Sequence, residues 1–396
     1  MLYNLAIVLY DLLVHLAAPF SRKPRKMMKG HWVVYELLRQ QVEKEERYIW
    51  FHAASLGEFE QGRPLIEKIR AEYPNYKILL TFFSPSGYEV RKHYRGADIV
   101  CYLPFDKPRN VRKFLDIVNP CMAFFIKYEF WKNFLDELHK RRIAVYSVSS
   151  IFRRDQNVLK DFDHLFVQNE ASKRYLSKIG ITRVTVVGDT RFDRVLQIRQ
   201  EAKDLPLVEK FKGNNSFTFV AGSSWGPDED LFLEYFNTHP EMKLIIAPHV
   251  IEENHLVEII SKLKRPYVRY TRADDKNVLK ADCLIIDCFG LLSSIYRYGE
   301  IAYIGGGFGV GIHNTLEAAV YGIPVIFGPK YQKFMEAIQL LEAKGAYSIK
   351  DYAELEKILD TFQADKQFLC DTGMNAGNYV VGNSGATERI MHMINF

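Results

Sequence analysis

Short apolar runs alternate with longer helical patterns along most of the chain. In the first half these runs are rich in β-branched and aromatic residues, which are typical of strands. We predict strands at residues 48–53, 77–82, 98–103, 122–126, 144–148, 164–166 and 184–187. Strands that alternate with helices indicate a parallel sheet covered by helices. This half of the chain therefore predicts one doubly wound α/β unit.

The alternation stops at residues 199–216 and then starts again. This polar stretch contains Pro206 and the turn Gly213-Asn214-Asn215, which are typical of a linker between domains. Beyond it we predict strands at residues 217–221, 243–247, 267–270, 283–286, 301–304 and 324–327. Two Rossmann-like domains that face each other place the carboxyl ends of both sheets around a central cleft, where ligands bind. We expect the functional residues at that cleft.

The N-terminal segment, residues 1–29, has a different pattern. Its first part is largely apolar, with interruptions at Asn4, Asp11 and His15. A basic cluster follows at Arg22, Lys23, Arg25, Lys26 and Lys29. A helix of about 20 residues spans ~30 Å, just enough for a bilayer core. We expect a retained membrane-anchor helix whose basic flank meets anionic headgroups; the alternative is an amphipathic helix buried within the protein.

The expected organisation therefore has four parts. Residues 1–29 form the anchor helix and its basic flank, and residues 30–200 and 201–385 form the two Rossmann-like domains. Residues 386–396 form a helix that packs back on the first domain. Deletion of residues 1–29 is expected to release the protein from membranes with its fold intact.

Composition excludes several classes of protein. The 396 residues are 48% hydrophobic and 26% charged, which excludes a disordered chain and a protein with many membrane spans. The net charge of +5 is too weak over this length to indicate nucleic acid, and we expect no nucleic-acid partner. The five cysteines form no C-x-x-C pair, so neither a disulfide framework nor a zinc site is indicated.

A glycine-rich segment follows the predicted strand at 301–304. Gly305-Gly306-Gly307 and two further glycines precede Asn314, where we expect a helix to begin. Glycines let a ligand approach the backbone closely, and amides at a helix start suit a phosphate. The spacing matches neither a P-loop nor a dinucleotide fingerprint. The alternative is a tight connection in which Asn314 caps the helix.

Three charged residues of the first half follow predicted strands. Glu58 lies at the start of a helix, where a carboxylate facing a cleft can act as a general base for a hydroxyl. Arg191 has the donors to bind a phosphate or carboxylate, and Glu129 is placed to orient a partner. The alternatives are helix capping by both glutamates and a surface ion pair of Arg191 with Asp189 or Asp193.

Polar residues also follow strands in the second half. Ser223 lies in Gly222-Ser223-Ser224-Trp225, and Pro248-His249 ends the next strand. Both segments are placed to contact a nucleotide base, ribose or phosphate. A lone histidine, however, is more often structural, so His249 by itself indicates little.

Seven segments, taken in order, resemble the 3-deoxy-D-manno-octulosonic acid (Kdo) transferases of lipopolysaccharide assembly. The segments are WFHAASLGEFEQGRPLI, KYEFWKN, VGDTRFD, AGSSW, IIAPH, GGGFGVGIHNTLEAA and PVIFGP. The resemblance covers nearly the whole chain. It implies a GT-B fold, an acceptor-binding first domain, a second domain that holds the nucleotide sugar, and attachment to the cytoplasmic face of the bacterial inner membrane.

The resemblance also implies roles for individual residues. Glu58 matches the general base of the family, and Glu129 and Arg191 match residues that stabilise the transition state. Residues implied to bind the CMP part of the donor are Ser223, Pro248, His249, Phe289, Gly290, Leu291, Gly306, Gly307, Asn314, Thr315, Leu316 and Glu317. Four of the matched positions depart from the commonest pattern, which has arginine at His249, an acidic residue at Leu291, proline at Thr315 and lysine at Arg191.

The expected activity is therefore an inverting transfer of Kdo from CMP-Kdo to a lipid A precursor, lipid IVA. CMP-Kdo is a substrate here, so we expect no cofactor and no bound metal. Because the GT-B scaffold carries many chemistries, an epimerase or a transferase of another nucleotide sugar stays open. A nucleotide-sugar binding protein without catalysis is the third alternative.

Overall fold

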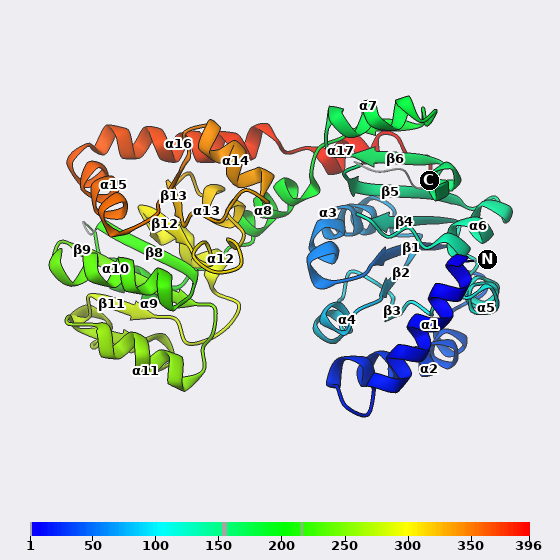
Figure 1. Cartoon of the computed structure of the whole chain (residues 1–396), viewed down its shortest axis with the longest axis horizontal. Coiled ribbons are helices and arrows are strands. Elements are labelled where there is room, and N and C mark those ends of the chain that lie inside the picture. The colour runs from blue at the N-terminus through cyan, green and yellow to red at the C-terminus, as the bar shows by residue number, and fades with distance from the viewer. Residues whose placement is uncertain (1, 153–156, 215–216) are drawn as a thin grey trace. The chain divides into compact units, whose positions relative to one another are not determined.

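The chain folds into two compact units, each built on a parallel sheet. The computed structural model describes residues 2–152, 157–214 and 217–396. The first unit comprises Met1–Arg194 and Ser384–Phe396, and the second comprises Val195–Asn383 (Figure 1). The last segment of the chain, which contains α17 (Ala386–Met391), thus belongs to the first unit.

The first unit contains a seven-stranded sheet in the order β3-β2-β1-β4-β5-β6-β7, with every pairing parallel. The strands are β1 (Tyr48–Ala53), β2 (Lys77–Phe82), β3 (Ile99–Tyr102), β4 (Met122–Ile126), β5 (Ala144–Ser150), β6 (His164–Val167) and β7 (Val184–Val186). The central strands β1 and β4 are buried along their whole length, as expected for a parallel sheet covered on both faces. The order reverses beside β1, so β1 and β4 flank the switch point where ligands of such sheets bind.

Helices cover both faces of this sheet. The helices of the first unit are α1 (Leu2–Ala17), α2 (Arg22–Gln41), α3 (Leu56–Glu72), α4 (Pro85–Arg91), α5 (Pro108–Val118), α6 (Lys132–Lys140), the 3-10 helix η1 (Asn157–Asp161), α7 (Glu170–Lys178) and α17, with α8 (Thr190–Gln200) beginning at its end. One core layer joins α2, through Val34 and Leu38, to α5, α6 and α7. The other layer joins α3 to α17, through Ala386 and Ile390.

The second unit repeats the architecture with a sheet in the order β10-β11-β9-β8-β12-β13-β14, again parallel throughout. Its strands are β8 (Phe217–Ser224), β9 (Met242–Pro248), β10 (Tyr267–Arg269), β11 (Cys283–Ile285), β12 (Ile301–Ile304), β13 (Val325–Phe327) and β14 (Ala346–Ser348). Its helices are α9 (Pro206–Lys212), α10 (Gly226–Thr238), α11 (Glu253–Lys262), η2 (Tyr270–Arg272), η3 (Val278–Lys280), α12 (Leu292–Ile295), η4 (Tyr296–Tyr298), α13 (Leu316–Ala319), α14 (Met335–Glu342), α15 (Tyr352–Ala364) and α16 (Lys366–Gly382).

The predicted strands are confirmed, with ends that differ by a few residues. β14 was not predicted, and the expected helix near Asn314 is the single turn α13. The stretch 199–216 is not a plain linker, because it contains the end of α8 and the whole of α9, with Val208 and Phe211 buried.

The N-terminal helices α1 and α2 bend by 117° at the break between them, and in the described residues neither helix alone is long and apolar enough to cross a membrane. One side of α1 packs on the first unit. The Tyr3 hydroxyl donates to Asp106 (2.5 Å), and Val14 packs with Met27 and Phe105. The opposite side exposes a row of leucines at Leu5, Leu9, Leu12 and Leu16. The expected membrane helix is therefore also a docked helix.

Candidate active site

Glu58 lies in the first turn of α3, directly after β1. The backbone amide of Ser55 donates to its carboxylate (3.0 Å), which fixes the side chain at the start of the helix. Burial raises the pKa of Glu58, and the negative charge of Glu129 raises it further, against the opposing effects of His52 and of the Ser55 amide. A half-buried carboxylate with a raised pKa is a good general base, because it holds a proton more strongly than an exposed one.

Glu129 follows β4 and is held by two neighbours. The indole N–H of Trp131 donates to its carboxylate (2.7 Å), and Nε2 of His52 lies 3.2 Å from the same oxygen. His52 is fully buried in β1, and its Nδ1 lies 2.9 Å from the hydroxyl of Thr81 in the adjacent strand β2. These contacts fix Glu129 at the carboxyl edge of the sheet. Glu129 lies near Glu58 there, because its charge raises the pKa of Glu58.

Sequence analysis did not identify His52 as part of this group. The residue stands inside the apolar strand segment Tyr48–Ala53, where a lone histidine is usually structural. The one signal was its position two residues before Ala54-Ser55, at the carboxyl end of the central strand.

Arg191 lies in the first turn of α8. Its Nε donates to a carboxylate oxygen of Asp189 (2.8 Å), and a second guanidinium nitrogen lies 2.8 Å from the same oxygen. This is the ion pair with Asp189 that the alternative interpretation proposed, whereas Asp193 accepts from Thr387 in the α17 segment. About a third of the Arg191 side chain is exposed, so its outer face is accessible. The pairing with Asp189 orients the guanidinium, a group whose donors suit a phosphate or a carboxylate.

A direct contact places α8 beside α3. Nε of Arg194, one turn after Arg191, donates to Glu60 (2.8 Å), and Glu60 lies two residues after Glu58. The structure thus brings Glu58, Glu129 and Arg191 to neighbouring segments of the first unit. These three are the residues for which the sequence analysis expected catalytic roles.

The second unit contains a pocket of about 240 Å³ at the carboxyl ends of β8, β9 and β11. Five of the expected donor-binding residues line it: Ser223, Pro248, His249, Phe289 and Gly290. Gly290 has a positive φ of 85°, and a Cβ added there would meet no atom within 4 Å, so its backbone faces open space. The Phe289 ring is 79% exposed. A half-open pocket with an accessible backbone suits the base and ribose of a nucleotide.

Three aromatic rings are stacked beside this pocket. The His249 ring lies 4.7 Å from that of Trp225 and 4.5 Å from that of His313. The Trp225 indole N–H donates to Nε2 of His313 (3.3 Å), and both burial and the His249 ring lower the pKa of His313. The stack brings His313, the residue before Asn314, beside the His249 ring that lines the pocket, whereas Asn314, Thr315, Leu316 and Glu317 do not line it.

The glycine-rich segment serves protein packing more than was expected. A Cβ on Gly305 would lie 2.3 Å from the Ser223 carbonyl oxygen, and one on Gly307 would lie 2.6 Å from the Gly328 Cα. The Gly306 amide donates to the buried carboxylate of Asp228 (2.9 Å). That amide is therefore occupied, and the expected anion cradle cannot use it without breaking a buried hydrogen bond.

The turn at Asn314 differs from the expected helix start. The Asn314 side chain accepts from the Leu316 amide (3.1 Å) and donates to Glu317 (2.9 Å), which agrees with its alternative role as a cap. Thr315 is fully buried and its hydroxyl has no hydrogen-bond partner among the described residues. With α13 only one turn long, little dipole is available for a phosphate. Leu291 caps the short helix α12 and does not line the pocket.

Comparison with known proteins decides the family. Residues 31–194 match the family model described as 3-deoxy-D-manno-octulosonic-acid transferase (kdotransferase). The 3-deoxy-D-manno-octulosonic acid transferase of Aquifex aeolicus (strain VF5) is 30% identical over 335 residues, which cover 81% of this chain and 89% of that protein. The chain belongs to the Kdo transferase family. The Haemophilus influenzae transferase of the same name is 24% identical over 87% of this chain and 86% of its own length.

Solved structures confirm the GT-B fold of this Kdo transferase. UDP-GlcNAc 2-epimerase from Neisseria meningitidis matches with a TM-score of 0.64 and 14% identity, covering 87% of this chain and 98% of that one. MurG from Acinetobacter baumannii matches with a TM-score of 0.57 and 8% identity over 88% of this chain and 99% of its own. At these identities the likeness shows the fold alone. The Kdo transferase is a glycosyltransferase by its sequence relatives, and the epimerase alternative is not supported.

Proposed function

We propose that this Kdo transferase moves Kdo from CMP-Kdo to a hydroxyl of a lipid A precursor, lipid IVA, at the cytoplasmic face of the bacterial inner membrane. The observation that carries the proposal is the half-buried carboxylate of Glu58, whose pKa is raised by burial and by Glu129. A protein that only binds nucleotide sugars has no use for such a base.

In the proposed reaction Glu58 takes the proton of the acceptor hydroxyl. The hydroxyl oxygen forms the new bond to the anomeric carbon of Kdo, while the bond from that carbon to the CMP phosphate breaks. CMP leaves with the electron pair, and attack from the opposite face inverts the configuration. General base catalysis of this kind contributes roughly 10²–10⁴-fold.

Glu129 and Arg191 stabilise the charges that develop during transfer. The anomeric centre becomes cation-like, and a carboxylate held in place by Trp131 and His52 is preorganised to stabilise it. The donor carries a carboxylate and a phosphate, and the accessible face of Arg191 suits either anion. Both roles are proposed from the chemistry of the Glu129 and Arg191 side chains.

The pocket at Ser223, Pro248, His249, Phe289 and Gly290 is the proposed site for the CMP part of the donor. The segment from Asn314 to Glu317 is proposed to complete it, because it follows His313, whose ring stacks on that of His249. We expect Gly306 and Gly307 to shape the turn, since the first has an occupied amide and the second packs on Gly328.

We further propose that transfer needs no bound metal, because Arg191 supplies a positive charge for the donor. Transfer measured with and without EDTA tests this. Equal rates are expected, and a rate that falls with EDTA and returns with a divalent cation would contradict it.

The exposed leucines of α1 and the basic cluster from Arg22 to Lys29 support the proposed attachment to inner-membrane lipids. Apolar side chains on one helix face and cations nearby are typical of a helix that lies in the membrane interface. The lipid acceptor comes from the same membrane.

The decisive experiment replaces Glu58 by glutamine. Glu58→Gln removes the base but keeps the size and hydrogen bonding of the side chain, so transfer from CMP-Kdo should fall by roughly 10²-fold or more. Binding of CMP, measured by calorimetry, should stay unchanged. Glu72→Gln, an exposed change at the far end of α3, is the matched control and should keep full activity. Full turnover by Glu58→Gln would remove Glu58 as the base.

A further inference from the structure

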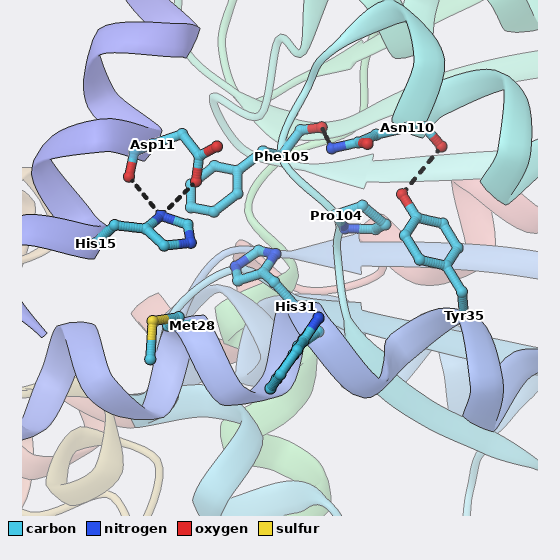
Figure 2. A pocket seen from close by; sticks show the side chains of 9 residues that line it. Asp11, His15, Met28, His31, Tyr35, Pro104, Phe105 and Asn110 are labelled. Carbon is cyan, nitrogen blue, oxygen red and sulfur yellow. Dashed lines mark hydrogen bonds and ion pairs between the residues drawn. The ribbon is translucent and has the colours of Figure 1, made fainter.

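A second pocket, of about 450 Å³, lies within the first unit and takes no part in the reaction described above. It opens between α1, α2 and the loop after β3, and Figure 2 shows its walls. The residues that define it are Asp11 on α1, then Met28, His31, Trp32 and Tyr35 on α2, and Phe105 in the loop. Its volume is within the range of pockets that bind small ligands.

Most of the wall surface is apolar, and three of its polar side chains bond to the protein: His15 to the Asp11 carbonyl, Asn110 to the Phe105 carbonyl and Tyr35 to the Asn110 carbonyl. The rings of His31 and Phe105 stack at 4.3 Å, and the side chain of Met28 lies beside them (Figure 2). Asp11 is paired with Lys107, so its negative charge is neutralised. A pocket with a mostly apolar wall favours a ligand that is itself largely apolar.

His31 is the polar group that has no protein partner. Both ring nitrogens are buried, and neither forms a hydrogen bond among the described residues. Burial lowers the pKa of His31 to about 4, with a small opposing effect of Asp11 and a further lowering by His15, so the ring is neutral near pH 7. A neutral imidazole has one N–H donor and one acceptor nitrogen. A buried donor without a partner is costly, which favours a ligand with a matching oxygen.

An aromatic wall continues from this pocket to the candidate base region. The rings of Phe105 and Phe83 lie 5.9 Å apart, and those of Phe83 and Trp131 lie 4.7 Å apart. Trp131 in turn donates to Glu129. Tyr10 of α1 packs against both phenylalanines, at 6.0 Å from each. This row of ring contacts, which we call the apolar path, therefore links Glu129 to the pocket between the N-terminal helices.

The other end of this path is the lipid-facing part of the unit. Trp32, on the pocket wall, is 86% exposed, and α1 carries its row of exposed leucines. An apolar group of a membrane lipid can thus enter from the membrane side while its polar end points toward Glu129. A soluble sugar has no group that would use such a path.

We propose that this pocket binds an acyl chain of the lipid acceptor, with the His31 N–H donating to the carbonyl oxygen of the ester or amide that joins the chain to the sugar. The inference rests on the proposed function, since it assumes that the acceptor is a lipid whose hydroxyl reaches Glu58. A pocket that binds an acyl chain lets the enzyme distinguish an acylated acceptor from a sugar acceptor without acyl chains.

Filling the pocket tests the proposal. Met28→Trp adds a large side chain at a half-buried wall position, and it should raise the KM for acylated lipid IVA by roughly tenfold or more. The kcat/KM for the fully deacylated sugar should stay unchanged. Gln40→Trp introduces the same side chain at an exposed position about 18 Å further along α2. Its KM and kcat/KM for both acceptors should equal those of the wild type. Equal losses with both acceptors, or no loss with either, would overturn the proposal.

A second measurement does not depend on turnover. The wild-type protein is mixed with vesicles that contain a lipid with a diazirine in its acyl chain, irradiated, and analysed by mass spectrometry. Labels on Met28 or Phe105 that disappear in Met28→Trp are expected, whereas labels only on the exposed Trp32 and the exposed leucines of α1 would refute an enclosed chain. His31→Phe, which keeps the stack on Phe105, should weaken use of the acylated acceptor alone.

These outcomes separate the two proposals. If the wild type transfers no Kdo but the pocket is labelled, the proposed function fails and the lipid site stands. If Kdo is transferred but the pocket is never labelled and Met28→Trp behaves like Gln40→Trp, the acyl-chain site fails and the proposed function stands.

Discussion

The carboxylates of Glu58 and Glu129 affect each other through their charges. Burial makes ionisation of Glu58 harder, and the negative charge of Glu129 adds to this effect. A base in this environment is protonated at a pH where an ordinary glutamate is ionised. Activity should therefore fall on the acid side at a higher pH than the ordinary pKa of glutamate would give.

Replacing Glu129 by glutamine tests this coupling. Glu129→Gln removes the charge that raises the pKa of Glu58, so the pKa of Glu58 falls and the acid limb of the kcat/KM profile moves to lower pH. The maximal rate also falls, because the carboxylate near the developing positive charge is lost. The pH profile of transfer from CMP-Kdo measures both effects.

Glu129→Asp is the control, because it keeps the charge. Its acid limb should stay near that of the wild type even if its rate is lower. An unshifted acid limb in Glu129→Gln would show that burial alone sets the pKa of Glu58, or that another group titrates.

Candidate site residues that follow strands could be found from the sequence, whereas one that lies inside a strand could not. Glu58, Glu129 and Arg191 each follow a strand, and the structure places them on neighbouring segments of one unit. His52 was missed because a buried strand position gives no sign of chemistry. The partner of the Gly306 amide, Asp228, is 78 residues away in the chain, and no local pattern reveals such a pair.

Among the elements, the buried strands were the most predictable. Strands such as Met122–Ile126 are continuous apolar runs, which a parallel sheet requires. β14 has only three residues, Ala346–Ser348, two of them half-buried, so its pattern resembles a loop. The helix expected near Asn314 is a single turn, Leu316–Ala319.

Among the elements, α1 is the one whose packing on the first unit could least be predicted from the sequence. Asp106 accepts from the amides of Asn133 and Phe134, both 3.0 Å, and so caps α6. The Tyr3 hydroxyl donates to the same carboxylate, and the Lys132 amide donates to Tyr3. Tyr3 and Asp106 are 103 residues apart, so an apolar N-terminus gave no hint of this network.

Tyr3→Phe should lower stability and disturb the segment that holds Glu129. The change leaves the Lys132 amide without its partner and removes one donor from the Asp106 carboxylate, which keeps the Asn133 and Phe134 amides; the loss costs about 1–3 kcal/mol. Trp131, next to Lys132, binds Glu129, so kcat should fall more than KM changes. Chemical denaturation and steady-state kinetics measure the two effects.

Tyr10→Phe provides the matched control on the same helix. Tyr10 is 41% exposed and packs through its ring, so loss of its hydroxyl should leave stability and kcat close to those of the wild type. If Tyr3→Phe behaves like Tyr10→Phe, the network does not support the active site.

At the scale of the whole molecule, the N-terminal helix α1 has a docked side and an exposed apolar side, so the two interpretations that the sequence presented as alternatives are compatible. The docked side of α1 carries Tyr3, Asn4, Asp11 and Val14, and the exposed side carries Leu5, Leu9, Leu12 and Leu16. The positions follow helical spacing on both sides. Asn4 and Asp11, two of the three polar residues that interrupt the apolar run, are therefore docking residues, and they explain why the segment is not a plain membrane span.

Because α1 has an exposed side and a docked side, membrane attachment and stability can be tested by separate changes. Changing Leu5, Leu9, Leu12 and Leu16 together to glutamine should abolish binding to anionic vesicles and leave the melting temperature nearly unchanged, because all four side chains are at least half exposed.

Deletion of residues 1–20 should also abolish binding, but it uncovers Met27 and Phe105 and leaves Asp106 short of a partner. It should therefore lower the free energy of unfolding by at least about 2 kcal/mol. A deletion variant that melts like the wild type in calorimetry would instead support the sequence-based expectation, made for residues 1–29, that deletion leaves the fold intact; vesicle flotation gives the binding.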